Sequence, residues 1–519
     1  MSALFSAPRA LTVRSPAIPV LAGQPVLVPL KLEGVEGINR LFEYKLILQT
    51  PDALNYMGGT ASNFDLTSWV GLELTCFMEL EGQGSFVVGL PGGSGAANQG
   101  AGVREISGLI TRAQFIGEAS RHALYEVTLR PWLHIATLNA DCKVFQDKTV
   151  VEVIEQVLSA YPFAADKRLI ETYRPCDYQV QYNESDFEFI TRLMQENGIN
   201  YHFEHSGGVH RLIWSDHNGA FQVTQQGQAS AYHSIPYYPL GHKIDREYIH
   251  GFRVIDMLTS GAYASREYDY TRPRAPLDAG AAAPRKTGHA DQEVYLWRGD
   301  KAGISGSDYS QPNKGADKAG NQSDEERGRD FARLRMQGLR QAGLRAYGVG
   351  HVRGVVPGCT FSLTGHPRER ANVEYIVLDT RLVVENVSED TQRVSFSGGT
   401  ASDIAGDSGQ GGGLMRGTAK SAPTLPAAPG YDAGLSALSD AQRLTGQWSV
   451  EVGFEVQPTT EALRPVATQR KPKTGTETAL VVGPSADTAE SNTYSFTHQP
   501  PHSTTATTSH TTTPVPPVC

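Results

Sequence analysis

Three polar side chains between residues 180 and 203 have types that could carry acid–base or metal chemistry. They are Glu184, Glu188 and His202. Carboxylates and an imidazole that lie close together can exchange a proton or bind a metal ion. A second interpretation is structural: carboxylates near a helix start act as caps, and a histidine on a strand occupies its polar face. We favour the structural interpretation and assign no catalytic, cofactor-binding or metal-binding residue.

The local pattern around these side chains supports that choice. Ser185 followed three residues later by Glu188 forms a capping box, which begins a helix. An apolar stripe with helical spacing follows, made of Phe189, Ile190, Leu193 and Met194. Asn197-Gly198 is a stop signal, because both residue types tolerate a left-handed backbone. The sequence therefore predicts a helix at 185–197 and, from the alternation after it, a half-buried strand at 199–204.

The remaining candidates for chemistry are isolated. His498, His502 and His510 have spacings that match no fixed metal site, so we expect no metal there. No Gly-x-Ser-x-Gly elbow of a serine hydrolase is present. The cysteines form no Cys-x-x-Cys pair, which indicates a reducing compartment and no disulfide framework; they are Cys76, Cys142, Cys176, Cys359 and Cys519. Cys519 is interpreted as an incidental terminal thiol.

Composition narrows the class of protein. The chain has 519 residues, enough for two to four domains, and its 53 glycines and 30 prolines are typical of a loop-rich, mainly β protein. The net charge is −9 without a block of lysine and arginine, which argues against a nucleic-acid partner. No run of about 18 apolar residues predicts a membrane span. Prolines and arginines interrupt the first 21 residues, so we expect no Sec signal peptide.

Alternating hydrophobicity and turn residues predict a mainly β fold with a few helices (α+β). We expect strands throughout 1–145, and in 146–398 further strands with helices near 149–160, 185–197 and 324–342. Thr149 and Glu152 form the capping box of the first of these helices. The polar stretch 275–322 is expected to be a long exposed excursion. The remaining expectations are a flexible insertion at 399–446, returning strands at 447–484 and a disordered Thr/Pro-rich tail at 485–519.

The predicted third helix is rich in arginine: Arg327, Arg329, Arg333, Arg335 and Arg340. Such a helix could be a docking face for a partner. It could also be a solvated face whose charge is balanced by the acidic residues Asp324, Glu325, Glu326 and Asp330. We favour the solvated face. The insertion at 399–446 likewise could tether a partner, but a tolerated surface loop is the simpler interpretation.

Several segments together resemble the VgrG family, the tip or spike proteins of the bacterial type VI secretion system, which are related to the baseplate hub of contractile phage tails. The most specific segment is Gln181-Tyr-Asn-Glu-Ser-Asp-Phe-Glu-Phe-Ile-Thr-Arg-Leu-Met with Gly198-Ile-Asn-Tyr-His-Phe. Others are Leu129-Arg-Pro-Trp-Leu, Glu267-Tyr-Asp-Tyr-Thr-Arg-Pro, Pro357-Gly-Cys-Thr-Phe-Ser-Leu and the stretch from Arg464 to Pro484. The resemblance covers about 10–398 and 446–484.

This resemblance implies a non-enzymatic hub with two β-barrel-like modules, 1–145 and 146–398. It implies a homotrimer that sits on the Hcp tube, contacts baseplate proteins and takes part in effector delivery. The protein would be assembled in the cytoplasm and exported by the type VI machinery. A hub of a contractile phage tail or phage-derived particle is the alternative, and a wall-degrading enzyme is less favoured.

The resemblance ends near Pro484. Family members continue there with a Gly-Arg-Val-Lys-Val-Gln-Phe-like strand, an oligosaccharide-binding-type barrel and a needle. Here Ser485 begins a low-complexity sequence instead. We therefore expect a chain truncated before its barrel and needle. A PAAR-type tip and effectors would bind only if the missing needle were supplied.

Overall fold

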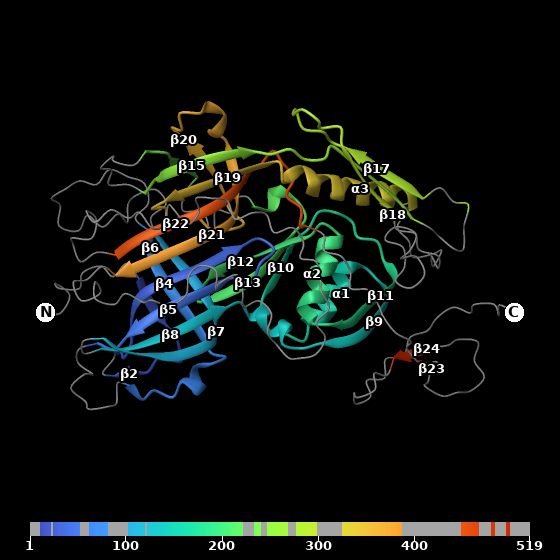
Figure 1. Ribbon diagram of the computed structural model, residues 1–519. Helices are drawn as coiled ribbons and strands as arrows, with labels where there is room; N and C mark the ends of the chain where they lie inside the picture. Colours follow the sequence, from blue (N-terminus) through green and yellow to red (C-terminus); the bar gives the residue numbers. More distant parts are fainter. Residues whose placement is uncertain are drawn as a thin grey trace.

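The protein is built mainly from strands, as predicted, with three α-helices among the residues described (Figure 1). The computed structural model describes residues 11–21, 24–51, 62–80, 102–119, 122–221, 233–239, 247–267, 274, 277–297, 324–386, 448–466, 479–482 and 495–498. None of the helices within these ranges has the length and hydropathy needed to span a bilayer.

One large sheet of twelve strands organises the molecule. Its main order is β1 (Leu11–Arg14), β6 (Glu73–Leu80), β7 (Gly102–Ala119), β8 (His122–Arg130), β5 (Glu43–Gln49), β4 (Val28–Gly37), β21 (Glu374–Asn386), β22 (Trp448–Pro458), β19 (Leu344–Gly350) and β15 (Ile249–Asp256). The strand β20 (Thr360–Thr364) pairs with β21, and β14 (Ser234–Pro236) pairs with β20. All pairs are antiparallel except β14 with β20.

Hydrophobic alternation explains why these segments form strands. On β5, Tyr44, Leu46 and Leu48 are fully buried, while the residues between them are partly exposed. The central strand β22 is buried on both faces over most of its length, which is why its sequence shows no clean alternation. The core beneath the sheet also takes in the two helices α1 and α2.

The seam between β4 and β21 joins strands that are far apart in the sequence. It runs from Gly37 opposite Asp379 to Lys31 opposite Glu385. Six strands that precede residue 131 lie on one side of this seam, and those that follow residue 233 lie on the other. The predicted module boundaries remain a prediction, and the boundary at 145 falls inside β9 (Asp141–Lys148).

The structure confirms the capping boxes that were predicted for two short helices. The helix α1 (Val150–Leu158) begins after Thr149, whose side chain accepts from Glu152 N while the Glu152 carboxylate accepts from Thr149 N. The helix α2 (Asp186–Glu196) begins after Ser185 with the same reciprocal arrangement. It ends as predicted, because Gly198 has a φ of +72°.

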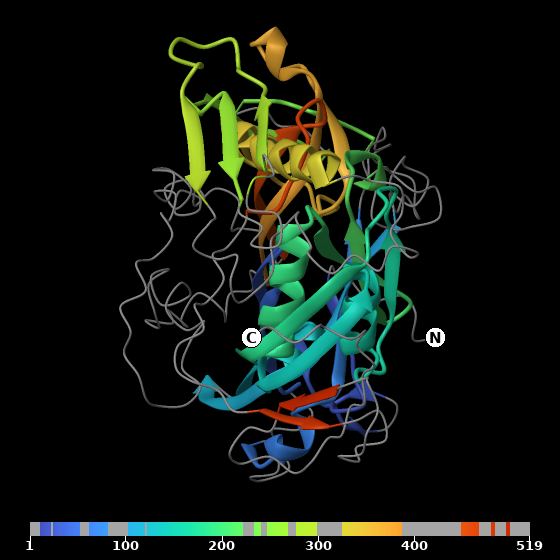
Figure 2. The same cartoon turned by 90° about the vertical axis from the view of Figure 1, so that its right-hand side faces the viewer.

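Three small sheets complete the fold. The strands β10 (Ala165–Arg168), β13 (Val209–Ser215) and β12 (Asn200–Ser206) form one, and β9 pairs with β11 (Cys176–Glu184) in another. The third contains β17 (Asp278–Ala282), β16 (Ala262–Arg266) and β18 (Glu293–Trp297), and one of its faces packs on α3 (Asp324–Gln341). Figure 2 shows these yellow-green strands side by side next to α3.

That third sheet corrects one expectation. The stretch 275–322 was predicted to be an exposed excursion, yet 277–297 contains β17 and β18 and contributes buried Leu277 and Ala279 to a hydrophobic cluster with α3. Its alanines and glycine are small because the backbone of β17 lies directly against the helix. Residues 298–322 lie outside the described residues.

Further elements are short: β2 (Val20–Leu21), β3 (Gln24–Pro25), and the 3-10 helices η3 (Leu66–Trp69), η5 (Trp132–Thr137), η6 (Asn218–Phe221) and η7 (Glu369–Ala371). Within the predicted tail, β24 (Ser495–His498) pairs with β23 (Ala479–Val482). The tail sequence did not predict this strand. The rest of the tail and the insertion at 399–446 lie outside the described residues.

Candidate functional site

The structure separates the side chains first considered for chemistry. Glu188 closes the capping box of α2, as predicted. Glu184 is not a cap: Arg192 donates to its Oε2 over 3.1 Å and also to its Oε1. The capping interpretation of Glu184 is therefore wrong, because Arg192, nearly two turns into α2, neutralises this carboxylate.

The prediction for His202 is also corrected. The side chain was expected on a polar strand face, but it is only 1% exposed. Phe221 of η6 lies 5.7 Å from its ring, and Gly358 approaches so closely that a Cβ there would lie 2.3 Å from the imidazole. Both faces of β12 are buried over Asn200–Phe203, because segments distant in sequence cover the second face. Glu204 lies 3.8 Å from His202 Nε2 and pairs with Arg168.

Of the histidines considered in the tail, one lies among the described residues. His498 lies in β24, while His502, His510 and Cys519 are outside the described residues. No group of three or more potential metal ligands occurs in the part of the chain that the structure describes. Polar side chains converge in several other places among the described residues, and two of these join segments far apart in the sequence.

The first is a buried charge cluster between the large sheet and β12, made of Glu36, Tyr44, Arg104 and His205. Tyr44 donates to Glu36 Oε2 over 2.8 Å, and Arg104 Nη2 lies 3.7 Å from the same oxygen. His205 Nδ1 accepts from Ser107 N, so the proton lies on Nε2, which is 3.1 Å from Glu36 Oε1. Arg104 also donates to the carbonyl of Arg353. The cluster thereby ties four strands and the loop after β19 together.

Burial and pairing set the protonation states here. Burial alone would raise the pKa of Glu36, but His205, Arg104 and Tyr44 outweigh it and hold that pKa below its usual value. Burial and the Glu36 charge raise the pKa of Tyr44. Burial and the neighbouring His205 lower the pKa of His210 to about 3, and its Nε2 accepts from Trp132 N. Glu36 is 1% exposed, so a dissolved substrate cannot reach this carboxylate without opening the sheet.

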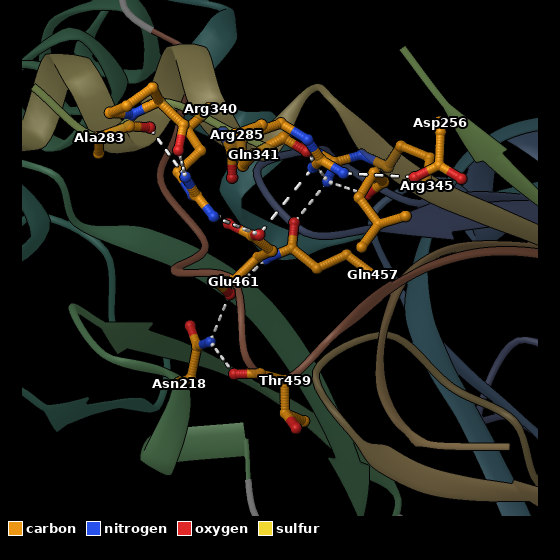
Figure 3. Close-up of polar contacts among 12 residues, drawn as sticks. Asn218, Asp256, Ala283, Arg285, Arg340, Gln341, Arg345, Gln457, Thr459 and Glu461 are labelled. Atoms are coloured by element: carbon orange, nitrogen blue, oxygen red, sulfur yellow. Dashed lines mark hydrogen bonds and ion pairs between the residues drawn. The ribbon is translucent and has the colours of Figure 1, made fainter. Parts of the chain in front are cut away.

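The second place is the exit junction, which we define as the contacts that hold residues 459–464 after β22 leaves the large sheet (Figure 3). The carboxylate of Glu461 accepts two hydrogen bonds from Arg340 of α3, at 2.9 and 3.2 Å. Arg285 Nη1 lies 3.9 Å from the same carboxylate. Arg340 also donates to the carbonyls of Ala283 and Pro284, at 2.8 and 2.9 Å. One arginine therefore links α3, the end of β17 and the exit segment.

Backbone groups of the exit segment are held as well. Asn218 of η6 donates to the carbonyls of Thr459 and Glu461, at 2.9 and 2.7 Å, and accepts from Leu463 N. Gln457 at the end of β22 donates to the carbonyl of Glu461 over 2.7 Å and accepts from Arg345 of β19. Such contacts replace the ladder hydrogen bonds that the chain loses when it leaves the sheet.

Arg464 completes the junction. It is 7% exposed, donates to the carbonyls of Gly198 and Asp216, and bonds Gln337 Oε1 at 2.7 Å. The side-chain amide of Gln341 donates to the Arg464 carbonyl and accepts from Arg464 N. Burial, with the nearby charge of Arg333, lowers the pKa of Arg464. The exit segment is thus fixed between α3, η6 and the turn that follows α2.

The favoured solvated-face prediction for the third helix is only partly right. Arg333 does lie at the surface, with Asp330 and Glu171 both 3.4 Å away. Arg340 instead lies in the exit junction, and Arg327 donates to Cys176 Sγ over 3.6 Å. The helix uses these arginines for contacts within its own chain. The periodicity of α3 pointed to a charged helix, but no sequence signal located Glu461, which is 121 residues from Arg340.

A profile of the phage tail baseplate hub (GPD) family matches residues 35–388, which include both sides of the β4–β21 seam. The chain belongs to this hub family. The matched range contains the buried charge cluster and α3, and it ends two residues after β21.

Several individual proteins with similar sequences are named as VgrG proteins. The chain is 30% identical over 386 residues to the type VI secretion system spike protein VgrG1a of Pseudomonas aeruginosa, covering 74% of this chain and 51% of that protein. It is 26% identical over 306 residues to the actin cross-linking toxin VgrG1 of Vibrio cholerae, covering 57% and 25%. A solved E. coli component of the type VI secretion system aligns with 91% of this chain and 84% of its own, with 14% identity and a TM-score of 0.49. The chain spans about half the length of the first of these relatives.

Proposed function

We propose that this chain is the hub of a type VI secretion tip, a structural component that assembles as a homotrimer on the Hcp tube. The observation that carries the proposal is the 30% identity to spike protein VgrG1a over 386 residues, which is 74% of this chain. Baseplate proteins would contact the same hub. Assembly would occur in the cytoplasm, and export would proceed through the type VI machinery.

The mechanical demands of such a part fit the two polar clusters. A hub at the end of a contracting tube must transmit force without its sheet opening. Buried, fully paired charges between strands resist shear because separating them exposes uncompensated charge. The exit junction does the same where the chain leaves the large sheet. Both features favour a structural role, and we propose that the chain is not an enzyme.

Co-assembly with Hcp tests this proposal. When the full chain is mixed with purified Hcp, the two should co-elute in size-exclusion chromatography, and light scattering should give the mass of three chains plus the bound Hcp. A chain that stays monomeric with Hcp present and never co-elutes would overturn the proposal. A variant with Arg340→Ala serves as a test of whether the exit junction is needed for assembly.

The two alternatives make different predictions. A hub of a phage tail or phage-derived particle, which the family description favours, would co-elute with the tube protein of that particle and leave Hcp unbound. A wall-degrading enzyme would release soluble fragments from purified peptidoglycan. The toxin relative matches over only 25% of its own length, so its name gives no activity to this chain. A PAAR-type tip and effectors would join through a needle.

A further inference from the structure

The small sheet β17–β16–β18 has two edges of opposite character. The β17 edge exposes Asp278, Gly280 and Ala282, which are small or charged, and α3 packs beneath this strand. The β18 edge exposes Tyr295, Leu296 and Trp297, which are 57%, 43% and 51% exposed. Natural sheets blunt their free edges with charge or small residues, so the bare apolar edge at β18 requires an explanation.

On each face of β18, some apolar side chains at that edge are left largely uncovered by neighbouring elements. Val294 and Leu296 point to the side of α3, but α3 lies across β17 and β16, so Val294 packs against the helix cluster while Leu296 remains largely uncovered. Tyr295 and Trp297 point to the opposite face. Their neighbours on that face are small or paired: Ala264 lies beside Tyr295, and Arg266 lies beside Trp297 with Asp278 at 3.5 Å.

Among the described residues, β18 has a strand on one side only. In the sheet order, β16 occupies one side of β18 and no strand among the described residues occupies the other. An added strand would find free backbone donors and acceptors along 293–297. It would also place alternate side chains over Leu296 on one face and between Tyr295 and Trp297 on the other. Tyrosine and tryptophan are the residue types that anchor such interfaces.

We propose that the β18 edge binds an extended segment of another protein, which adds as a fourth strand to the small sheet. The charge at this edge defines the partner further. Asp291 and Glu293 are exposed at its start, and the exposed Arg266 beside Trp297 is already paired with Asp278. The partner segment therefore carries apolar side chains at alternate positions and a lysine or arginine near Glu293. The proposal does not depend on trimerisation or on Hcp.

Peptide binding to the full chain tests the proposal. The probe is a fluorescein-labelled eight-residue peptide that alternates valine with threonine and has lysine at both ends. A second probe carries glutamate in place of lysine, and a third has N-methyl groups on alternate residues. Fluorescence anisotropy should show saturable binding of the first probe. We expect about tenfold weaker binding of the other two, since charge complementarity and backbone hydrogen bonds are lost.

Matched variants locate the site. Leu296→Lys and Trp297→Ala should each weaken binding of the first probe about tenfold, whereas Ala282→Lys at the β17 edge should change it less than twofold. Circular dichroism and an unchanged thermal midpoint show that the variants fold. Absence of saturable binding to the wild-type chain would overturn the proposal, and so would equal binding of the N-methylated probe.

Two other occupants would give distinct results, and either would overturn the proposal. If a second copy of the chain covers the edge, light scattering without peptide should show self-association that Leu296→Lys abolishes. If the chain's own residues 298–323 cover it, the first probe should bind only after that segment is replaced by a short glycine-serine linker. Loss of Hcp binding with intact peptide binding would count against the proposed function alone.

Discussion

The large sheet and the small sheet beside α3 differ in how their polar groups and edges are satisfied. The large sheet buries a charge cluster against β12, where Glu36 and Arg104 of the large sheet meet His205. The small sheet has its apolar cluster on one face only and leaves Leu296 and Trp297 exposed at its edge. The exit junction connects the two regions through Arg340 and Glu461.

This difference indicates two roles within one chain, resistance to opening and binding of a partner. Buried, paired charges raise the cost of any partial opening, so the large sheet is suited to remain closed under load. An unfinished edge with exposed aromatic side chains is suited to acquire a partner. If the comparison holds, variants in the large sheet should destabilise the whole fold, and variants in the small sheet should act locally.

The largest effect is expected from Arg104→Ala in the buried charge cluster. Removing the guanidinium leaves Glu36 buried without its cation, which costs about 3–5 kcal/mol in the free energy of unfolding. Urea denaturation followed by tryptophan fluorescence measures it. The matched control is Lys31→Ala, whose partially exposed pair with Glu33 should contribute less than about 1 kcal/mol. Equal losses in the two variants would show that the cluster is not a special feature of the large sheet.

A pH dependence should follow from His210, which lies beside that cluster. Its pKa is lowered to about 3 in the folded chain, while an unfolded histidine titrates near 6.5. Between these values the unfolded chain binds more protons, so the free energy of unfolding falls as the pH falls. At pH 4.5 the loss is about 2–3 kcal/mol from this residue.

The variant His210→Gln isolates the effect, because glutamine can still accept from Trp132 N. Its stability should decline less than that of the wild type between pH 6.5 and 4.5. Asp379 acts in the opposite direction: burial raises its pKa to about 6, so the folded chain takes up that proton first and gains stability as the pH falls toward 4. Parallel pH profiles of variant and wild type would refute the role of His210.

Breaking the exit junction should uncouple the large sheet from the small sheet beside α3. Arg340→Ala removes two charge-assisted hydrogen bonds to Glu461 and should cost about 2 kcal/mol. A double-mutant cycle with Glu461→Ala should give a coupling of about 1–2 kcal/mol. Arg333→Ala, on the same helix but at the surface, is the matched control with a loss of less than about 1 kcal/mol. A coupling near zero would mean that the junction does not link the sheets.

The smallest effect concerns the cap of α2. Ser185→Ala should cost about 1 kcal/mol, whereas Ser185→Asn should leave stability nearly unchanged because asparagine also caps helices. The loss can be read from the thermal midpoint. Thr149→Ala provides the comparison at the more exposed cap of α1. A loss of equal size in the alanine and asparagine variants would rule out capping as the cause.

Local signals predicted the parts of this fold that depend on a few neighbouring residues. The capping boxes at Thr149 and Ser185 and the stop at Gly198 each involve residues less than four positions apart, so the sequence alone defined both helices. The mainly β class followed from alternation and turn residues in the same way.

Long-range pairing lay beyond those signals. Arg104 meets the carbonyl of Arg353 across 249 positions, and Arg464 meets that of Gly198 across 266. The burial of His202 depends on Gly358, which no local pattern associates with β12. The small sheet was missed because its Ala- and Gly-rich strand β17 has the composition of a loop, although α3 requires small residues there.

The pairing of β21 with β22 has a practical consequence. After a register shift at Val377–Asp379 the two strands stay paired to the end where Asn386 lies opposite Trp448, and residues 387–447 connect them. Both ends of this connection are therefore held side by side by the sheet itself. Doubling its length would cost only about 0.6 kcal/mol in closure entropy. A fluorescent protein, an epitope or an additional folded domain could be spliced into the chain at this position while the strands on either side keep their register.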